Sequence, residues 1–371
     1  MNKKVALRSC NEYDFNEVYR NISDIFSFCE GPDVRNKKVL IKPNILSDTP
    51  PDKCVTTHPV VIEAIIRYLQ DNGASAVYIG DSPAVHIGRF RPEKSGIMDV
   101  CRKTGAEWVS FLKHPSELKL NRGSIKVTSV IHDVDLIISV PKLKNHELVY
   151  FTGAIKNTLG LVPGFHKTRQ HAMYQDRHNF SRFLVDLNEA LTPHFFIMDG
   201  IIGMEGSGPA QGVPYRTGVL IGSSNPLAID IIASTVAGYD PALIPTNKVA
   251  LTRGKWLSRP DEIIYDGPVL SGVIKKDFKR IPITGFANIS VRFLSNRLIL
   301  LRKLEKRPVF IRSKCTGCGE CIKICPEEAI EFHPQNIKHV VLTDKKCIRC
   351  YCCSEVCRFN AVRIRVKLFG V

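Results

Sequence analysis

Eight cysteines near the C-terminus, spaced as two matching runs, constrain the fold of this chain more than any other feature. The first run has the pattern C-x2-C-x2-C-x3-C-P and consists of Cys315, Cys318, Cys321 and Cys325. The second run repeats the cysteine spacing and consists of Cys347, Cys350, Cys353 and Cys357. Nine of the 13 cysteines lie between Cys315 and Cys357. A block of thiols this dense is typical of metal ligation.

Two runs of this spacing are the signature of a bacterial-type ferredoxin module with two [4Fe-4S] clusters, in which the fourth cysteine of each run binds the other cluster. One cluster is therefore expected on Cys315, Cys318, Cys321 and Cys357. The other is expected on Cys325, Cys347, Cys350 and Cys353. The alternative is zinc, but a zinc site usually takes two C-x2-C pairs and four ligands in all, which two matching runs fit poorly.

Two positions depart from the usual pattern. Arg358 follows the second run where proline is common, and Cys352 places an additional thiol beside Cys353. A ligand at Cys352 would require the less usual C-x-C spacing, so Cys353 is the expected ligand. The four cysteines outside this block are expected to be reduced and buried.

Residues 1–270 predict an α/β domain, because short apolar runs alternate with stretches of helical periodicity. The expected strands are 38–41, 76–79, 108–111, 136–140, 195–198 and 219–221. The expected helices are 14–29, 59–71, 179–191 and 226–237. This alternation favours a layered, largely parallel sheet. We expect a basic connector at 271–310 and a small α+β ferredoxin domain at 311–371 to follow it.

Polar clusters follow the predicted strands at their carboxyl ends, where ligands bind in sheets of this kind. Lysines with Asn or His neighbours recur there and predict a cationic pocket for a carboxylate or phosphate. The candidate catalytic residues are Lys42, His58, Asp81, Lys142, Lys144, His146, Lys156, His171 and Asp199. The histidines would supply protons and the aspartates would orient them. The candidates for binding a substrate or cofactor are Asn44, Thr57, Asn145, Asn157, Gly206 and Gly208.

Each of these features also has an ordinary structural explanation. A lysine at a strand end is usually a solvated charge, the Thr-Thr-His-Pro start of a helix is usually a cap, and a lone histidine is usually structural. Only the recurrence of the lysines favours an anion site. The sequence contains no Walker P-loop, no G-x-G-x-x-G dinucleotide motif, no G-x-S-x-G elbow and no diagnostic spacing for a flavin or a further metal.

Positive charge is concentrated in the connector. The chain has 52 Lys and Arg against 36 Asp and Glu, and residues 275–314 alone hold 12 against 2. Three interpretations are open for the connector: a helix with a solvated basic face, a docking segment for an acidic redox partner such as a ferredoxin or flavoprotein, or a peripheral contact with an anionic membrane surface. Nucleic acid is not an expected partner, because no binding motif or set of interleaved aromatics is present.

Several short motifs resemble those of domain-of-unknown-function family 362. They are KPN at 42–44, TTHP at 56–59, GDS at 80–82, SVPKLKNHE at 139–147, TGAIKNTLG at 152–160 and DGIIGMEGSGP at 199–209. Members of the family often carry a C-terminal two-cluster ferredoxin module. The resemblance covers nearly the whole chain and implies an iron–sulfur protein of anaerobic or redox metabolism, without supplying a substrate.

The combined features predict an iron–sulfur oxidoreductase whose two clusters pass electrons to or from a small anionic substrate or cofactor in the α/β domain. One alternative is a non-catalytic electron-transfer protein that docks a redox partner. Another is a non-redox enzyme with structural clusters. No run approaches the ~20 apolar residues of a membrane-spanning helix, and no apolar stretch follows the N-terminal lysines, so a cytoplasmic location is expected.

Overall fold

The computed structural model describes residues 2–83, 90–112, 114–174, 176–283, 306–357 and 359–366. The chain forms two compact units. The first comprises Met1–Lys167 and Asp176–Ile281, and the second comprises Thr168–Gln175 and Pro282–Val371. Residues 271–281, predicted as part of the connector, thus belong to the first unit. Most of the remaining connector, residues 284–305, lies outside the described residues.

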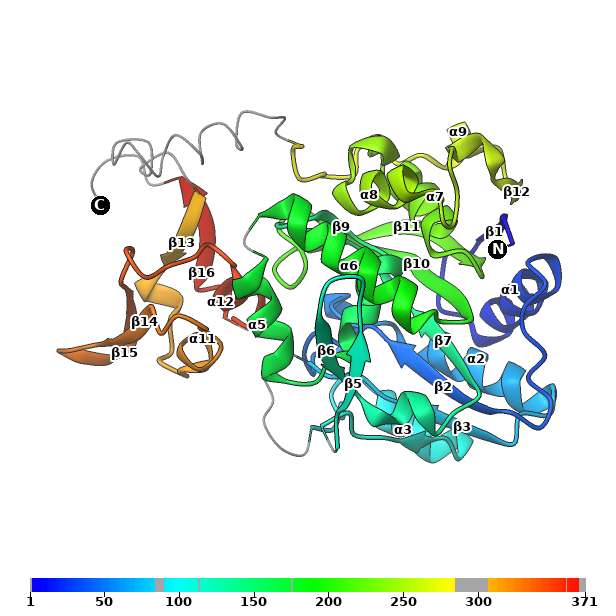
Figure 1. The fold of residues 1–371 in the computed structure, drawn as a ribbon, viewed down its shortest axis with the longest axis horizontal. Helices are drawn as coiled ribbons and strands as arrows, with labels where there is room; N and C mark the ends of the chain where they lie inside the picture. The colour runs from blue at the N-terminus through cyan, green and yellow to red at the C-terminus, as the bar shows by residue number, and fades with distance from the viewer. Residues whose placement is uncertain are drawn as a thin grey trace. The chain divides into compact units, whose positions relative to one another are not determined.

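The first unit is built on a mixed, largely parallel sheet with the strand order β12-β1-β11-β10-β7-β2-β3-β4, as predicted for its class (Figure 1). Strands β8 and β9 extend it beside β10. The strands are β1 Lys4–Ser9, β2 Lys38–Pro43, β3 Ala76–Ile79, β4 Glu107–Trp108, β7 Leu136–Val140, β8 Lys142–His146, β9 Tyr150–Thr152, β10 Phe195–Glu205, β11 Val213–Ser223 and β12 Ile264–Asp266. A separate hairpin joins β5 Ser116–Lys119 to β6 Ser124–Val127.

The central strands are parallel and buried on both faces. Strand β2 pairs in parallel with β3 on one side and with β7 on the other, and β7 pairs in parallel with β10. The sequence of β7, Leu-Ile-Ile-Ser-Val, is buried throughout. Continuous apolar runs of this kind are what a strand covered on both faces requires. The antiparallel pairs are β1 with β11, β10 with β11 and β8 with β9.

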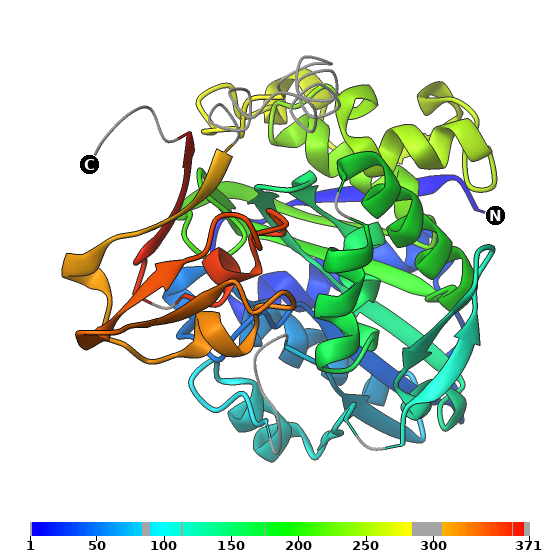
Figure 2. The same cartoon turned by 60° about the vertical axis from the view of Figure 1, so that its left-hand side comes forward.

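Helices cover both faces of the sheet (Figures 1 and 2). One face carries α1 Phe15–Phe28, α2 Pro59–Asp71 and α3 Ile97–Thr104. The other carries α4 Ala154–Asn157, α6 Arg177–Leu191, α7 Pro226–Val236 and α8 Pro245–Arg253. Helix α1 begins where the Asp14 side chain accepts a hydrogen bond from the Glu17 amide. Helix α2 begins at Pro59 with His58 as its cap, which is the expected start.

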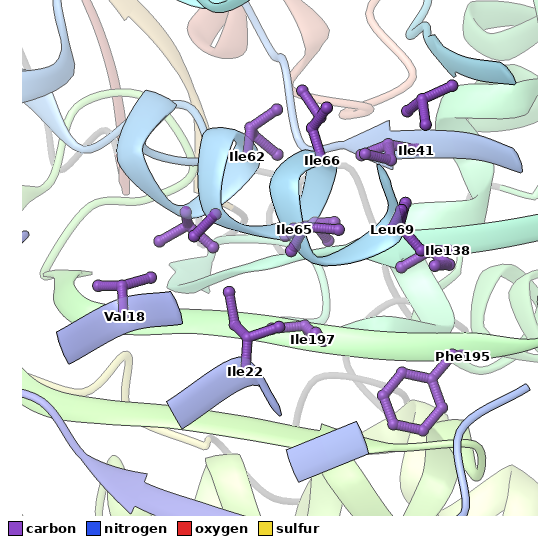
Figure 3. Close-up of a cluster of buried hydrophobic side chains, with 14 of the residues drawn as sticks. Val18, Ile22, Ile41, Ile62, Ile65, Ile66, Leu69, Ile138, Phe195 and Ile197 are labelled. Atoms are coloured by element: carbon purple, nitrogen blue, oxygen red, sulfur yellow. The ribbon is translucent and has the colours of Figure 1, made fainter. Parts of the chain in front are cut away.

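An apolar core lies between the sheet and helices α1 and α2. Figure 3 shows side chains of both helices directed toward strands β2, β7 and β10. The members labelled there are Val18, Ile22, Ile41, Ile62, Ile65, Ile66, Leu69, Ile138, Phe195 and Ile197. All ten are completely buried. Burial of a side chain of this size contributes about 1.5–3 kcal/mol, so this layer holds the strand ends of the site in place.

The second unit is a small α+β module, as predicted. Strand β13 Lys306–Phe310 pairs with β16 Val362–Val366, and β14 Ile330–His333 pairs with β15 Asn336–Leu342, both antiparallel. Two short helices, α11 Glu320–Lys323 and α12 Cys352–Glu355, lie within the cysteine runs. Helix α5, Phe165–Met173, spans the division between the units, and α9, Leu270–Val273, lies near the end of the first. Among the described helices, none has both the length and the apolar character needed to cross a membrane.

Candidate functional site

The eight cysteines of the two runs line two separate cavities in the second unit. One cavity, of about 340 Å³ including its opening to solvent, is lined by Cys315, Cys318, Cys321 and Cys357. The other, of about 330 Å³, is lined by Cys325, Cys347, Cys350 and Cys353. Each run therefore sends its fourth cysteine to the cavity of the other run, which is the crossed arrangement predicted from the spacing.

This donor set fits [4Fe-4S] clusters. Four thiols surround each cavity, and burial raises the pKa of Cys321 to about 12 and that of Cys325 above its usual value. Buried thiols of this kind become thiolates only when a metal replaces the proton, since metal ligation deprotonates them. Cys352 is buried and lines the second cavity beside Cys353, with its Sγ 4.0 Å from the Cys350 carbonyl oxygen.

The predicted site in the first unit lies where strand order reverses. From β2 the chain crosses to β3 on one side, and β7 lies on the other side of β2. A crevice forms at such a reversal, beyond the carboxyl ends of the two strands. At this end of the strands the Thr57 hydroxyl donates to the Val140 carbonyl at 2.7 Å and accepts from the Asn44 amide at 2.9 Å.

Lys42 lies at the end of β2 in a network of buried polar groups. Its Nζ donates to Asp81 Oδ2 at 3.0 Å, to Asn157 Oδ1 at 3.0 Å and to the Pro43 carbonyl at 2.6 Å. Asn157 also donates to Ser139 Oγ at 2.9 Å. Burial lowers the pKa of Lys42, and the Asp81 carboxylate opposes that effect. The structure thus brings together Lys42, Asp81 and Asn157, with the ammonium and the carboxylate paired.

Lys142 and Asp199 form a second buried pair. Lys142 Nζ lies 2.7 Å from Asp199 Oδ2 and 2.8 Å from the Tyr13 hydroxyl oxygen. The Tyr13 hydroxyl donates in turn to Asp199 Oδ1 at 3.0 Å. Burial raises the pKa of Tyr13 well above its usual value, and Asp199 adds to that effect, so the phenol keeps its proton near neutral pH. Tyr13 was not predicted as a site residue, because the sequence around it does not indicate that its hydroxyl is buried.

His58 stacks on Tyr13. The ring centroids are 3.5 Å apart with an interplanar angle of 8°. Burial lowers the pKa of His58 from 6.5 to about 4, so the ring is neutral at neutral pH. Its Nδ1 accepts from the Val60 amide at 3.3 Å, which assigns the ring proton to Nε2. Asp199 binds the backbone amide of His58 at 2.9 Å and orients the residue through its main chain.

Lys144 lies two residues further along β8 and is 1% exposed. Its Nζ donates to the Val55 carbonyl at 2.8 Å, and its strand partner across β9 is Thr152. Three buried oxygen atoms lie on the segments around it, and no described residue offers them a hydrogen bond. These atoms are Asn44 Oδ1, Thr56 Oγ1 and Thr152 Oγ1.

Asn145, Gly206 and Gly208, which were predicted to bind a substrate or cofactor, lie close together and contact one another and Lys279. Asn145 Nδ2 donates to the Gly206 carbonyl at 3.1 Å and to the Lys279 carbonyl at 2.8 Å. A Cβ on Gly208 would lie 2.1 Å from the Asn145 carbonyl oxygen, so only glycine fits there. Tyr239 completes the group by donating to Asn145 Oδ1 at 2.8 Å.

The remaining candidates are His146, Lys156 and His171. His146 is buried, and its Nδ1 accepts from the Leu148 amide at 3.1 Å. Lys156 is partly exposed on α4, and its charge contributes to the lowered pKa of Lys42, to which burial contributes most. For His171 in α5 the structure describes only the backbone. A further residue, Asp230, was missed: it accepts from the Ala154 amide at 2.5 Å and the Ile155 amide at 3.1 Å at the start of α4.

Comparison with known proteins agrees with this architecture. The family described as Domain of unknown function (DUF362) matches residues 39–235, and a 4Fe-4S dicluster domain matches residues 314–361. A thylakoid-associated protein of Synechocystis is 30% identical over 276 residues, which cover 70% of this chain and 85% of that protein. One component of the H(2):CoB-CoM heterodisulfide,ferredoxin reductase of Methanothermobacter marburgensis is 35% identical over 77 residues, which cover 16% of this chain and 12% of that protein.

Among solved structures, the lactate racemase apoprotein of Thermoanaerobacterium thermosaccharolyticum superposes with a TM-score of 0.41 at 14% identity. The match covers 62% of this chain and 57% of that one. The family match spans more than half of the chain, and the cyanobacterial relative is matched over most of its length. This protein therefore belongs to the DUF362 family and carries a 4Fe-4S dicluster domain at its C-terminal end.

Proposed function

We propose that this protein is an iron–sulfur oxidoreductase whose two clusters pass electrons to or from a small anionic substrate or cofactor held by the α/β unit. The observation that carries the proposal is a pair of buried hydroxyl oxygens without a described hydrogen-bond partner, on segments that contact Lys144: Thr56 Oγ1, next to Val55, and Thr152 Oγ1, opposite Lys144 on β9. Most buried polar atoms in native proteins have a partner, and those that lack one are often completed by a ligand or water. A lysine and two hydroxyls suit the oxygens of a carboxylate or phosphate.

The other two buried lysines have a different part in this proposal. Lys42 is paired with Asp81 and Lys142 with Asp199. Their pairs fix the carboxyl end of β2 and the first residue of β8, and thereby position Lys144 and Thr56. Lys144 would contribute binding energy for the anion, because its side chain is 1% exposed and charges interact more strongly in a low-dielectric environment.

Tyr13 and His58 are the groups best placed to handle a proton. The raised pKa of Tyr13 keeps its hydroxyl protonated, and the lowered pKa of His58, about 4, keeps its ring neutral with Nε2 as a donor. Bound [4Fe-4S] clusters would supply or accept single electrons. Lys142 holds the Tyr13 hydroxyl in place at 2.8 Å. A direct role of His58, His146 or His171 in proton supply stays a prediction.

The test uses the full-length protein, loaded with clusters under anaerobic conditions. Thermal unfolding of the α/β unit is followed by tryptophan fluorescence, since Trp108 and Trp256 both lie in that unit. Inorganic phosphate and a panel of two- to four-carbon carboxylates are the probes. An anion that binds is expected to raise the unfolding temperature, as any ligand specific for the native state does. The same anion should accelerate oxidation or reduction of the clusters.

Lys144→Met should abolish the stabilisation by the anion, while the iron content stays at about eight per chain, as two cubanes require. The matched control is Lys119→Met, because Lys119 lies exposed on β5. An equal response of wild type and Lys144→Met to every anion would contradict the anion site. Turnover should also be lost in Lys142→Ala and Lys144→Ala with cluster absorbance intact.

The alternative of a non-catalytic electron-transfer protein is supported by the net charge of +16. Such a charge favours association with an acidic partner and makes the association rate sensitive to salt. That function predicts no stabilisation of the α/β unit by any small anion. A non-redox enzyme with structural clusters would instead bind an anion and turn over at a rate independent of the cluster oxidation state.

A further inference from the structure

Three exposed apolar side chains of residues 306–366 belong to segments next to one of the two cluster cavities. They are Phe332 at 43% exposure, Ile337 at 75% and Phe359 at 44%. Phe359 lines the cavity of Cys315, Cys318, Cys321 and Cys357 directly. We call these three side chains the apolar face.

The Phe332 side chain and the backbone of Ile337 lie against the loop between the first cysteines. A Cβ on Gly319 would lie 3.2 Å from Phe332 Cζ, and a Cβ on Gly317 would lie 2.5 Å from the Ile337 carbonyl oxygen. Both glycines have φ near +70°, a conformation that L side chains rarely adopt. The loop that carries Cys318 is therefore held against β14 and β15, and Cys318 itself is exposed.

The second cavity is more enclosed. Among its four ligands, Cys353 is buried, and Cys325, Cys347 and Cys350 are only partly accessible. Arg349, next to Cys350, is 8% exposed and binds Asp344 at 2.9 Å. None of the three side chains of the apolar face lines this cavity. Among the eight described ligands, only Cys318, at the first cavity, is exposed to solvent.

Basic residues border the apolar face. Arg312 and Lys314 directly precede the first cysteine, and Lys338 follows Ile337; all three are exposed. Glu331 is the exposed acidic residue beside Phe332. An apolar centre with a charged rim is the usual composition of a transient protein interface, and a rim of positive charge is complementary to an acidic protein surface.

We propose that the apolar face docks an acidic electron-carrier protein, and that electrons cross there through the cavity of Cys315, Cys318, Cys321 and Cys357. In each transfer one electron leaves a reduced cluster, which is thereby oxidised, and the same electron reduces the carrier. In the reverse direction one electron passes from the reduced carrier to an oxidised cluster. The inference shares with the proposed function only the redox activity of the clusters. It does not depend on the anion site beside Lys144.

The test mixes full-length, cluster-loaded protein, reduced with dithionite and desalted, with oxidised flavodoxin as the acidic one-electron carrier. Stopped-flow absorbance gives the bimolecular rate, and calorimetry at low ionic strength gives the Kd. Ile337→Glu and Lys338→Glu are each expected to lower the rate and the affinity about tenfold, because they place negative charge in the face or its rim. The wild-type rate should fall as salt is added.

Val269→Glu is the matched control, because Val269 is 77% exposed and lies in the first unit. It should leave both the rate and the Kd unchanged. Methyl viologen, a small acceptor that needs no docking surface, should oxidise all variants at the wild-type rate. The proposal is overturned if flavodoxin neither binds nor reacts with the wild type, or if both module variants behave as wild type. The proposal is also overturned if Val269→Glu lowers the rate as much as the module variants do, or if the module variants react with methyl viologen as slowly as they do with flavodoxin.

Discussion

Lys142 Nζ and Asp199 Oδ2 lie 2.7 Å apart, and neither side chain is more than 1% exposed to solvent. A buried pair of this kind is costly to break, because removing one partner leaves the other charged and without compensation. Lys142→Met should therefore lower the free energy of unfolding of the α/β unit by about 3–5 kcal/mol. Urea denaturation followed by the fluorescence of Trp108 and Trp256 measures it.

The double variant Lys142→Met/Asp199→Asn is the informative control for this prediction. It removes the uncompensated charge while the amide oxygen still accepts hydrogen bonds, so it should be more stable than Lys142→Met alone. A Lys142→Met protein within about 1 kcal/mol of the wild type would show that the pair contributes little.

The lowered pKa of His58 predicts a pH dependence of stability. The unfolded chain binds a proton at this residue near pH 6.5, whereas the folded chain does so only near pH 4. The stabilisation is therefore complete above pH 6.5 and is lost as the pH falls toward 4. Lowering the pH from 7 to 5 should destabilise the wild type by about 1–2 kcal/mol more than His58→Asn, which retains a helix-capping side chain. Parallel losses in both proteins would argue against a neutral buried ring.

Gly160 lies against the other buried pair. A Cβ at this position would lie 2.2 Å from Asp81 Oδ1 and 2.2 Å from Lys42 Nζ. Gly160→Ala should therefore destabilise the α/β unit by about 1–3 kcal/mol, as overpacking usually does. Gly272→Ala is the control, since a Cβ on Gly272 meets no described atom within 4 Å. Equal unfolding midpoints for the two variants would show that the pair can shift at little cost.

The adjacent thiols Cys352 and Cys353 allow the ligand register to be tested. Cys353→Ser should lose a ligand of the second cluster and fall from about eight irons per chain toward four, whereas Cys352→Ser should keep about eight. Iron analysis and the electron paramagnetic resonance spectrum of the reduced protein distinguish the two. The reverse pattern would place the ligand at Cys352.

Much of the sheet could be predicted because its central strands are apolar throughout. Strand β7 begins and ends as predicted at 136 and 140, and helix α2 at 59 and 71. Strand β8, Lys-Leu-Lys-Asn-His, was not predicted as a strand, because nothing in a polar run indicates that it is buried throughout. Strand β4 occupies Glu107–Trp108 rather than the predicted 108–111.

The sequence predicted several residues of the candidate site, but it did not predict which lysine pairs with which aspartate. The lysines and aspartates could be named because they follow strands, yet Lys142 and Asp199 are 57 positions apart in the sequence, and only the parallel pairing of β8 with β10 brings them together. Asp230 could have been identified from the sequence, since it is the single charged residue in the apolar helix α7. Burial raises its pKa to about 7, while it binds two amides at the start of α4.

The crossed cysteines bear on how the ferredoxin module can be built. Cys325 comes from the first run and lines the second cavity, and Cys357 comes from the second run and lines the first. Neither half of the module therefore contains the complete ligand set of any cluster. If the chain were interrupted between the two runs, each fragment would contain three ligands of one cluster and a single ligand of the other. Biogenesis of the two clusters is for this reason a joint event, and it must wait until the last cysteine has left the ribosome.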